Sequence, residues 1–267
     1  MNAPTSAAET ALRNGDAAGA LKLLTDQVRA RPQDAKLRTF LFQLLAVLGQ
    51  WDRALNQLSV AAELDAAALP MAQTYREAIH CETLRLQVFA GQKVPMLFGE
   101  PEPWIALLIE ALLREGRGEP EAGATLRAQA LDEAPASAGK MDGEAFEWIA
   151  DADGRLGPTL EAVINGRYYW LPFNRLLVVK IEAPADLRDA VWMPAHFTFA
   201  NGGETVGLIP TRYPDTELAL GDATALARRT EWRERPHGLW VGLGQRLITT
   251  SANEKALMDI RSIEIGA

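Results

Sequence analysis

The first half of the chain carries apolar residues at helical spacing. Between positions 36 and 48, alternating steps of three and one build a single stripe of Leu37, Phe40, Leu41, Leu44, Leu45 and Leu48. A second stripe, from 104 to 112, begins just after Pro103, and proline suits the first turn of a helix. A third runs from 71 to 89. These patterns predict amphipathic helices, each with one buried face.

A longer period relates residues 15–28 to residues 49–62. Gly15, Ala20, Leu21, Leu24 and Val28 are followed 34 residues later by Gly49, Ala54, Leu55, Leu58 and Ala62, and four of the five pairs are identical. This is the tetratricopeptide period. A degenerate further unit is predicted over 103–135, and a plain helical bundle is the alternative. We therefore expect an all-α, tetratricopeptide-like domain over residues 1–139.

The second half, residues 140–267, follows a different pattern. Val191, Met193, Ala195, Phe197 and Phe199 alternate with other residues, which predicts a strand that Pro194 places at an edge or a bulge. Further strands are predicted at 146–151, 166–171, 175–182, 205–210, 239–243, 246–250 and 262–265.

Between the first two of these strands, Gly157-Pro158 and Asn165-Gly166 predict the start and end of a short helix. The fold class expected for the whole chain is α+β. Helical repeats come first, and a mostly antiparallel β domain with short helices follows.

The composition argues against several classes of function. With 27 Lys and Arg against 35 Asp and Glu the net charge is -8, which argues against nucleic-acid binding. Each half has a net charge of -4. Residues 1–139 contain 13 basic and 17 acidic residues, and residues 140–267 contain 14 basic and 18 acidic residues. No apolar run approaches a membrane span, and the first residues lack a secretory signal. We expect no membrane association and a cytoplasmic location. Cys81, the single cysteine, excludes an internal disulfide.

No catalytic constellation emerges from the sequence. His80, His196 and His237 are scattered, and Asp-x-Asp-Gly at 151–154 lacks the later glutamate of a calcium loop, so a tight turn explains it better. The run of Arg228, Arg229, Arg233 and Arg235 is interleaved with glutamates and is interpreted as a solvated segment. We expect no enzyme activity, no cofactor and no metal.

One group of residues is predicted to contact a partner: Trp192, His196, Arg212 and Tyr213. Trp192 and His196 lie opposite the apolar face of their strand, and Arg and Tyr are common at binding hot spots. The alternative is that Trp192 covers the core and Arg212 is a structural ion-pair partner. A further alternative is an enzyme pocket formed by His196, Glu204, Arg212 and Tyr213.

The order of features resembles one known family. A helical-repeat half is followed by FEWIADADGRLGP, GRYYWLPF, VWMPAHFTFANGGE and LIPTRYP, and these phrases are similar to the ImpE family, also called SciE or TagJ. The resemblance implies a non-enzymatic, virulence-associated adaptor of type VI secretion. Its implied partners are the N-terminal helix of the small sheath subunit and the ClpV-type AAA+ ATPase that disassembles the sheath. A generic repeat regulator or cochaperone outside secretion is the alternative.

The repeats also suggest how a partner is held. A short repeat array that ends against a second domain leaves a groove with apolar edges, and such a groove fits an amphipathic helix. We expect the helix to carry Lys or Arg beside its apolar stripe, because both halves of the chain are acidic.

Overall fold

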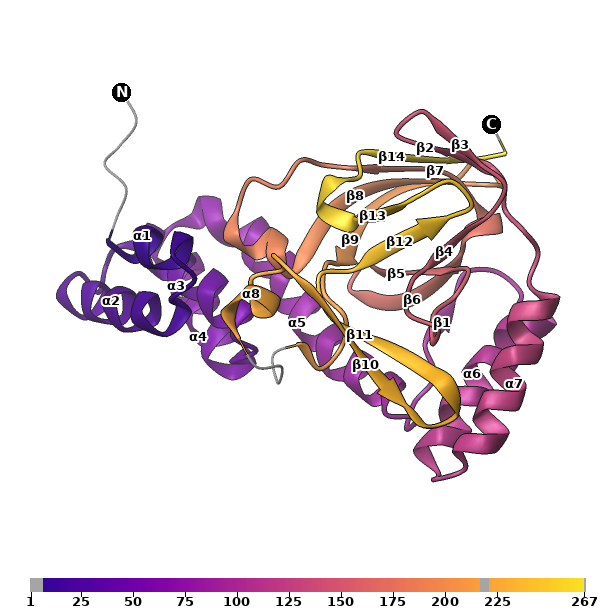
Figure 1. Cartoon of the computed structure of the whole chain (residues 1–267). Coiled ribbons are helices and arrows are strands. Elements are labelled where there is room, and N and C mark those ends of the chain that lie inside the picture. Colours follow the sequence, from indigo (N-terminus) through magenta and orange to yellow (C-terminus); the bar gives the residue numbers. More distant parts are fainter. Residues whose placement is uncertain (1–6, 217–220, 267) are drawn as a thin grey trace.

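A computed structural model describes residues 7–216 and 221–266. Most of the helices precede most of the strands along the chain, and Figure 1 shows α1 to α4 at one end of the molecule, α6 and α7 at the other, and α5 between them. This confirms the α+β expectation. The α-helices are α1 (Ala7–Arg13), α2 (Ala17–Ala30), α3 (Ala35–Val47), α4 (Trp51–Leu64), α5 (Leu69–Phe89), α6 (Pro103–Gly116), α7 (Pro120–Glu133) and α8 (Asp222–Ala225). The short 3₁₀ helices are η1 (Ala66–Ala68), η2 (Phe173–Arg175), η3 (Leu187–Ala190), η5 (Pro236–Gly238) and η6 (Leu257–Asp259).

The 34-residue period corresponds to two helix pairs, α1 with α2 and α3 with α4. Gly15 and Gly49 end the first helix of each pair with φ of +80° and +66°, a conformation that glycine adopts without steric cost. Asp16 and Asp34 then cap α2 and α3 by accepting hydrogen bonds from backbone amides three residues on. Helices α6 and α7 form a further pair.

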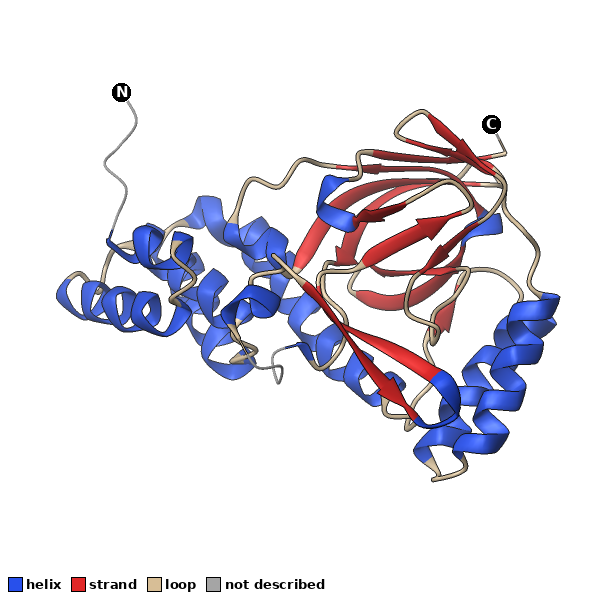
Figure 2. Ribbon diagram, in the orientation of Figure 1, coloured by secondary structure: helices blue, strands red, loops and turns tan. Residues whose placement is uncertain are grey.

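The strands of the described residues form three β-structures (Figure 2). The largest is a nine-stranded sheet in the order β1-β6-β5-β9-β8-β7-β14-β2-β3, antiparallel except where β1 pairs with β6. A three-stranded sheet, β13-β12-β4, and a ribbon, β10-β11, are the other two. The strands are β1 (Met96–Leu97), β2 (Gly139–Met141), β3 (Glu144–Phe146), β4 (Ile149–Asp151), β5 (Thr159–Ile164), β6 (Arg167–Pro172), β7 (Leu176–Ile181), β8 (Trp192–Phe199), β9 (Glu204–Pro210), β10 (Thr230–Arg235), β11 (Leu239–Gly244), β12 (Leu247–Thr250), β13 (Glu254–Ala256) and β14 (Ser262–Ile265).

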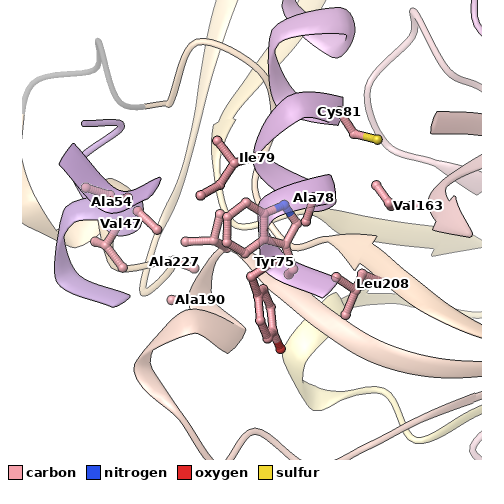
Figure 3. Packing of buried hydrophobic residues seen from close by; sticks show 14 of the residues in the cluster. Val47, Ala54, Tyr75, Ala78, Ile79, Cys81, Val163, Ala190, Leu208 and Ala227 are labelled. Carbon is pink, nitrogen blue, oxygen red and sulfur yellow. The ribbon is translucent and has the colours of Figure 1, made fainter. Parts of the chain in front are cut away.

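Side chains on the two faces of the nine-stranded sheet enter two different cores. Met193, Ala195 and Phe197 of β8 share a cluster with Ile248 of the three-stranded sheet. Trp192, on the opposite face of β8, belongs to a second cluster together with helical residues. This second core extends from α1 to the segment after α8, and Figure 3 shows its centre around Tyr75. The helical half and the sheet therefore share one continuous apolar core.

Two local predictions are wrong. Residues 159–164 form strand β5 rather than a helix, and Asn165-Gly166 is the turn of the β5–β6 hairpin, with φ of +49° and +70°. A two-residue Asn-Gly loop favours this kind of turn because both residues tolerate positive φ. Strand β8 is internal, paired with both β7 and β9. Pro194 is accommodated because it lies just beyond the last β7 pair, where its carbonyl accepts a hydrogen bond from the Glu182 amide.

The predicted division at 139/140 stays a prediction. The helical half is not purely helical, because β1 joins the large sheet, and β2 already begins at Gly139. Helix α5 contacts β6 directly. We therefore expect the two halves to unfold together.

We predict that Ala54→Leu destabilises the protein. Ala54 is fully buried in α4, so the larger side chain overpacks its contacts and is expected to cost about 1–3 kcal/mol. The free energy of unfolding, measured in urea, tests this. The matched control is Asn56→Leu on the exposed surface of the same helix, for which we expect almost no change. Equal stability of the two variants would contradict the close packing of α4.

Candidate partner-binding grooves and the network that holds them

The structure separates the four residues that the sequence predicts as one partner-facing patch. Trp192, Arg212 and Tyr213 are 0%, 4% and 1% exposed, so they do not form an accessible surface, and that expectation is wrong for these three. The alternative enzyme pocket of His196, Glu204, Arg212 and Tyr213 is not brought together either, because His196 and Glu204 line a surface hollow while Arg212 and Tyr213 are buried. His196 is the exception, with an imidazole that is 59% exposed and lies 3.3 Å from Glu182. A partner contact at His196 stays a prediction.

Trp192 is buried because α5 covers its face of the sheet. The indole lies 5.7 Å from the ring of Tyr75 and 5.9 Å from that of Trp51, and its Nε1 donates a hydrogen bond of 2.8 Å to Glu82. Side chains alternate along β8, so His196 is on the same face, but it lies beyond the edge of α5 and reaches solvent. This corresponds to the alternative in which Trp192 covers the core.

Arg212 and Tyr213 bind interior polar groups. The Arg212 guanidinium donates to the carbonyl oxygens of Val47, at 2.7 Å, and Ala225, at 2.6 Å, which are the last residues of α3 and α8. A cation at a helix C-terminus satisfies unpaired carbonyls and interacts favourably with the helix dipole. The Tyr213 hydroxyl lies 3.1 Å from the Asp151 carboxylate.

A buried ion-pair network joins α5 to the sheets. Glu161 of β5 accepts hydrogen bonds from Arg85 of α5 at 2.6 and 3.0 Å, and it also pairs with Arg246, which precedes β12. Arg246 in turn pairs with Asp151 of β4. The hydroxyl of Tyr168 donates to Glu161 as well. All five side chains are at least 96% buried, so each charge depends on its partners.

The two carboxylates of this network have opposite pKa shifts. Burial alone raises the pKa of Glu161, but the positive charges of Arg85 and Arg246 outweigh it and lower the pKa to about 2. Burial raises the pKa of Asp151 to about 6, in spite of the attraction of Arg246. Glu161 therefore stabilises the charged interior, while an ionised Asp151 is costly.

No pattern in the sequence predicted this network. The predicted helix over 158–165 concealed Glu161 as a polar position within an otherwise apolar strand. Arg85 and Glu161 are 76 residues apart, and Arg246 and Asp151 are 95 apart, so no local pattern connects them. The useful signal is the pair Glu161 and Tyr168, which a β5–β6 hairpin places on the same face.

Two grooves flank the segment that leads into η3. The repeat groove has a volume of about 880 Å³ and is lined by Leu12 of α1, Leu37 and Phe40 of α3, and Ala185 and Leu187 of the β half. It therefore lies where the helical repeats meet the second half. The sheet groove, of about 870 Å³, lies between α5 and the uncovered face of β8 and β9 and includes His196 and Val206.

The described part of the chain offers no metal-binding constellation. Within it, no cluster of three or more His, Cys, Asp or Glu side chains is placed to hold a metal ion. None of the helices described is both long and apolar enough to span a bilayer.

We predict that Glu161→Gln lowers the free energy of unfolding by about 3–5 kcal/mol, because it removes the shared partner of Arg85 and Arg246 and leaves buried positive charge. Urea denaturation at pH 7 measures this. Glu204→Gln, at an exposed position of the same sheet, is the control and is expected to leave stability unchanged. A similar small effect of both substitutions would refute the role given to Glu161.

We predict a different pH dependence for Asp151→Asn. The folded pKa of about 6 lies above the ordinary value of 3.8, so the native state holds a proton that the unfolded state has lost, and stability falls as the pH rises between these values. Asp151→Asn has no carboxyl group to ionise at this position, so its stability does not fall for this reason. From pH 4.5 to pH 7, the unfolding free energy of the wild type relative to the variant should fall by about 2 kcal/mol. A difference that rises with pH would reverse the sign assigned to Asp151.

Comparison with known proteins identifies the family. The family model described as "ImpE protein" matches residues 143–264. A Pseudomonas aeruginosa protein, "Type VI secretion system accessory component TagJ", is 54% identical over 257 residues, which cover 96% of this chain and 90% of that protein. The crystal structure of protein VPA1032 from Vibrio parahaemolyticus is similar over 98% of both chains, with a TM-score of 0.89 and 26% identity. The resemblance in the sequence is confirmed, and the chain belongs to the ImpE family.

Proposed function

We propose that this protein is an accessory adaptor of type VI secretion, that it acts in the cytoplasm, and that it has no catalytic activity. In this proposal, the repeat groove binds the N-terminal helix of the small sheath subunit, and the protein links that helix to the ClpV-type ATPase. The relative named as a type VI secretion accessory component supports the assignment of this protein to that secretion system. The repeat groove is the observation that carries the mode of binding.

The lining of the repeat groove suits the apolar stripe of a helix. Lys36, Phe40 and Gln43 follow one another at helical spacing along α3 and form one wall, and Leu12 of α1 adds apolar surface beside them. Leu187 closes the groove from the β half. Phe40 and Leu37 are half-buried, so their outer edges remain available to a ligand helix with apolar residues at i, i+3, i+4 and i+7.

Charge favours a basic ligand. The groove is bordered by Glu9, Asp34, Asp65 and Asp186, against Arg13, Lys36 and Arg228. Its small negative excess has the same sign as the net charge of -8 of the chain. Long-range attraction of this kind raises the association rate and weakens in salt.

We predict that a labelled peptide from the N-terminus of the small sheath subunit binds the full chain saturably. Because the attraction is partly electrostatic, the association rate should fall between low and high ionic strength, and stopped-flow fluorescence measures it. Absence of saturable binding at both ionic strengths would remove the central contact of the adaptor proposal.

A variant within the groove tests the location. Thr39 lines the repeat groove, so Thr39→Arg places a long cationic side chain in the path of the ligand and should weaken binding of the peptide by about tenfold or more. Asn56→Arg introduces the same side chain on exposed α4 and serves as the control. Equal affinities of the two variants would place the peptide elsewhere.

A further inference from the structure

Strands β10 and β11 form a separate two-stranded ribbon that runs from near α8 toward the α6–α7 pair, in front of α5 in the view of Figure 1. Trp232 lies opposite Gly242, and Glu234 lies opposite Trp240. In an antiparallel pair, alternate residues point their backbone groups at the partner strand or away from it.

The register shows which backbone groups face outward. The Gln245 amide donates to the Arg229 carbonyl at 3.0 Å, and these residues are opposite each other when the pairing is extended by one step. Alternation from this pair turns Arg233 toward β11, whereas the backbone groups of Trp232 and Glu234 point away from it.

The outer edge of β11 is sealed by the protein itself. The Gly242 amide donates to the Asp153 carboxylate at 2.9 Å, and the Gly244 amide donates to the Thr216 hydroxyl at 2.9 Å. The Gly244 carbonyl accepts a hydrogen bond from the Tyr213 amide at 2.9 Å. The outward amides of Gly242 and Gly244 and the Gly244 carbonyl therefore have fixed partners at this edge.

The outer edge of β10 differs. Among residues 7–216 and 221–266, the outward amides of Trp232 and Glu234 donate no hydrogen bond to another group of the protein. The strands at the ends of the other two sheets are short: β1 has two residues and β3, β4 and β13 have three each, while β10 has six. Short edge strands offer little to a foreign strand, but a strand of six residues is long enough to pair with one.

The side chains of the ribbon give this edge a chemical preference. Trp232 and Trp240 are diagonal neighbours on one face and are 36% and 51% exposed. Arg233 and Arg235 extend from the other face of β10. Residues 228–238 contain four arginines and two glutamates, a net charge of +2 within a chain of -8. Exposed tryptophan and arginine are typical of binding hot spots.

We propose that β10 is a docking edge for an extended, acidic segment of a partner protein in which acidic and apolar residues alternate. Such a segment adds a third strand to the ribbon and receives the amides of Trp232 and Glu234. Because side chains alternate between the faces of a strand, its acidic residues lie on the face of Arg233 and Arg235, and its apolar residues lie on the face of Trp232. This surface is separate from the repeat groove.

The probe is a fluorescent eight-residue peptide in which glutamate alternates with valine, titrated into the full chain and followed by anisotropy. We expect saturable binding that weakens as salt is added. A peptide of the same sequence with an N-methyl group on every amide has no free edge with which to pair as a strand, and it should not bind. No saturable binding of the first peptide, or equal binding of both, would overturn the proposal.

Glu234→Pro is the decisive variant. Proline at 234 removes an outward amide without removing a hydrogen bond between β10 and β11, and it should weaken the peptide about tenfold. Glu234→Ala removes the same side chain, keeps the amide, and should bind at least as tightly as the wild type. Equal affinity of the two variants would show that the edge is not used.

A second pair of variants tests the charge. Arg233→Glu should weaken the peptide, whereas Arg29→Glu, at an exposed position of α2, should not. Thermal melting checks that all four variants fold. Equal binding by the two arginine variants would contradict the role given to Arg233.

Discussion

The ion pairs of Glu161 with Arg85 and Arg246 fix how the helical half sits on the sheet. A carboxylate buried on β5 is tolerated only where cations reach it, and one of those cations comes from α5. If α5 were shifted along the sheet, both Arg85 and Glu161 would be left buried without their partner. Apolar contacts such as Phe89 against Trp170, at 5.8 Å, add stability but select position less strictly than paired charges do. The network therefore sets the register of helix on sheet.

The position of α5 determines the surfaces that remain. Because α5 covers the β5–β6 side of the sheet and the Trp192 end of β8, the face near His196 stays open and forms the sheet groove. On the other side, η3 contacts α3, where it closes the repeat groove. Arg212 strengthens this junction, since one guanidinium binds the last carbonyls of α3 and α8. The positions of both grooves are thus set by buried contacts that hold α5 and η3 in place, and not by the side chains that line the grooves.

What the sequence predicted correctly is local in origin. The stripe from Leu37 to Leu48 corresponds to α3, and the apolar run after Arg175 corresponds to β7, because helical and strand periodicities are visible within a few residues. The errors arise where local signals are ambiguous or contacts are distant. Asn165-Gly166 suits a helix end as well as a hairpin turn, and the hairpin was decided by pairing of β5 with β6. Arg212 looked like a surface residue, yet its acceptor at Val47 is 165 residues away.

The perturbed ionisable groups of the interior are all accounted for by structural partners. Shifted pKa values of buried carboxylates often point to catalysis. Asp151 and Glu161, however, have partners from within the chain and are sealed beneath α5 and the ribbon, and neither lines a groove. Their strong electrostatics stabilise the arrangement of elements. The repeat groove and the β10 edge instead present half-buried apolar side chains, exposed charges and free backbone amides, which are the means by which proteins bind helices and strands of other proteins. These two surfaces therefore suit the proposed role in binding other proteins.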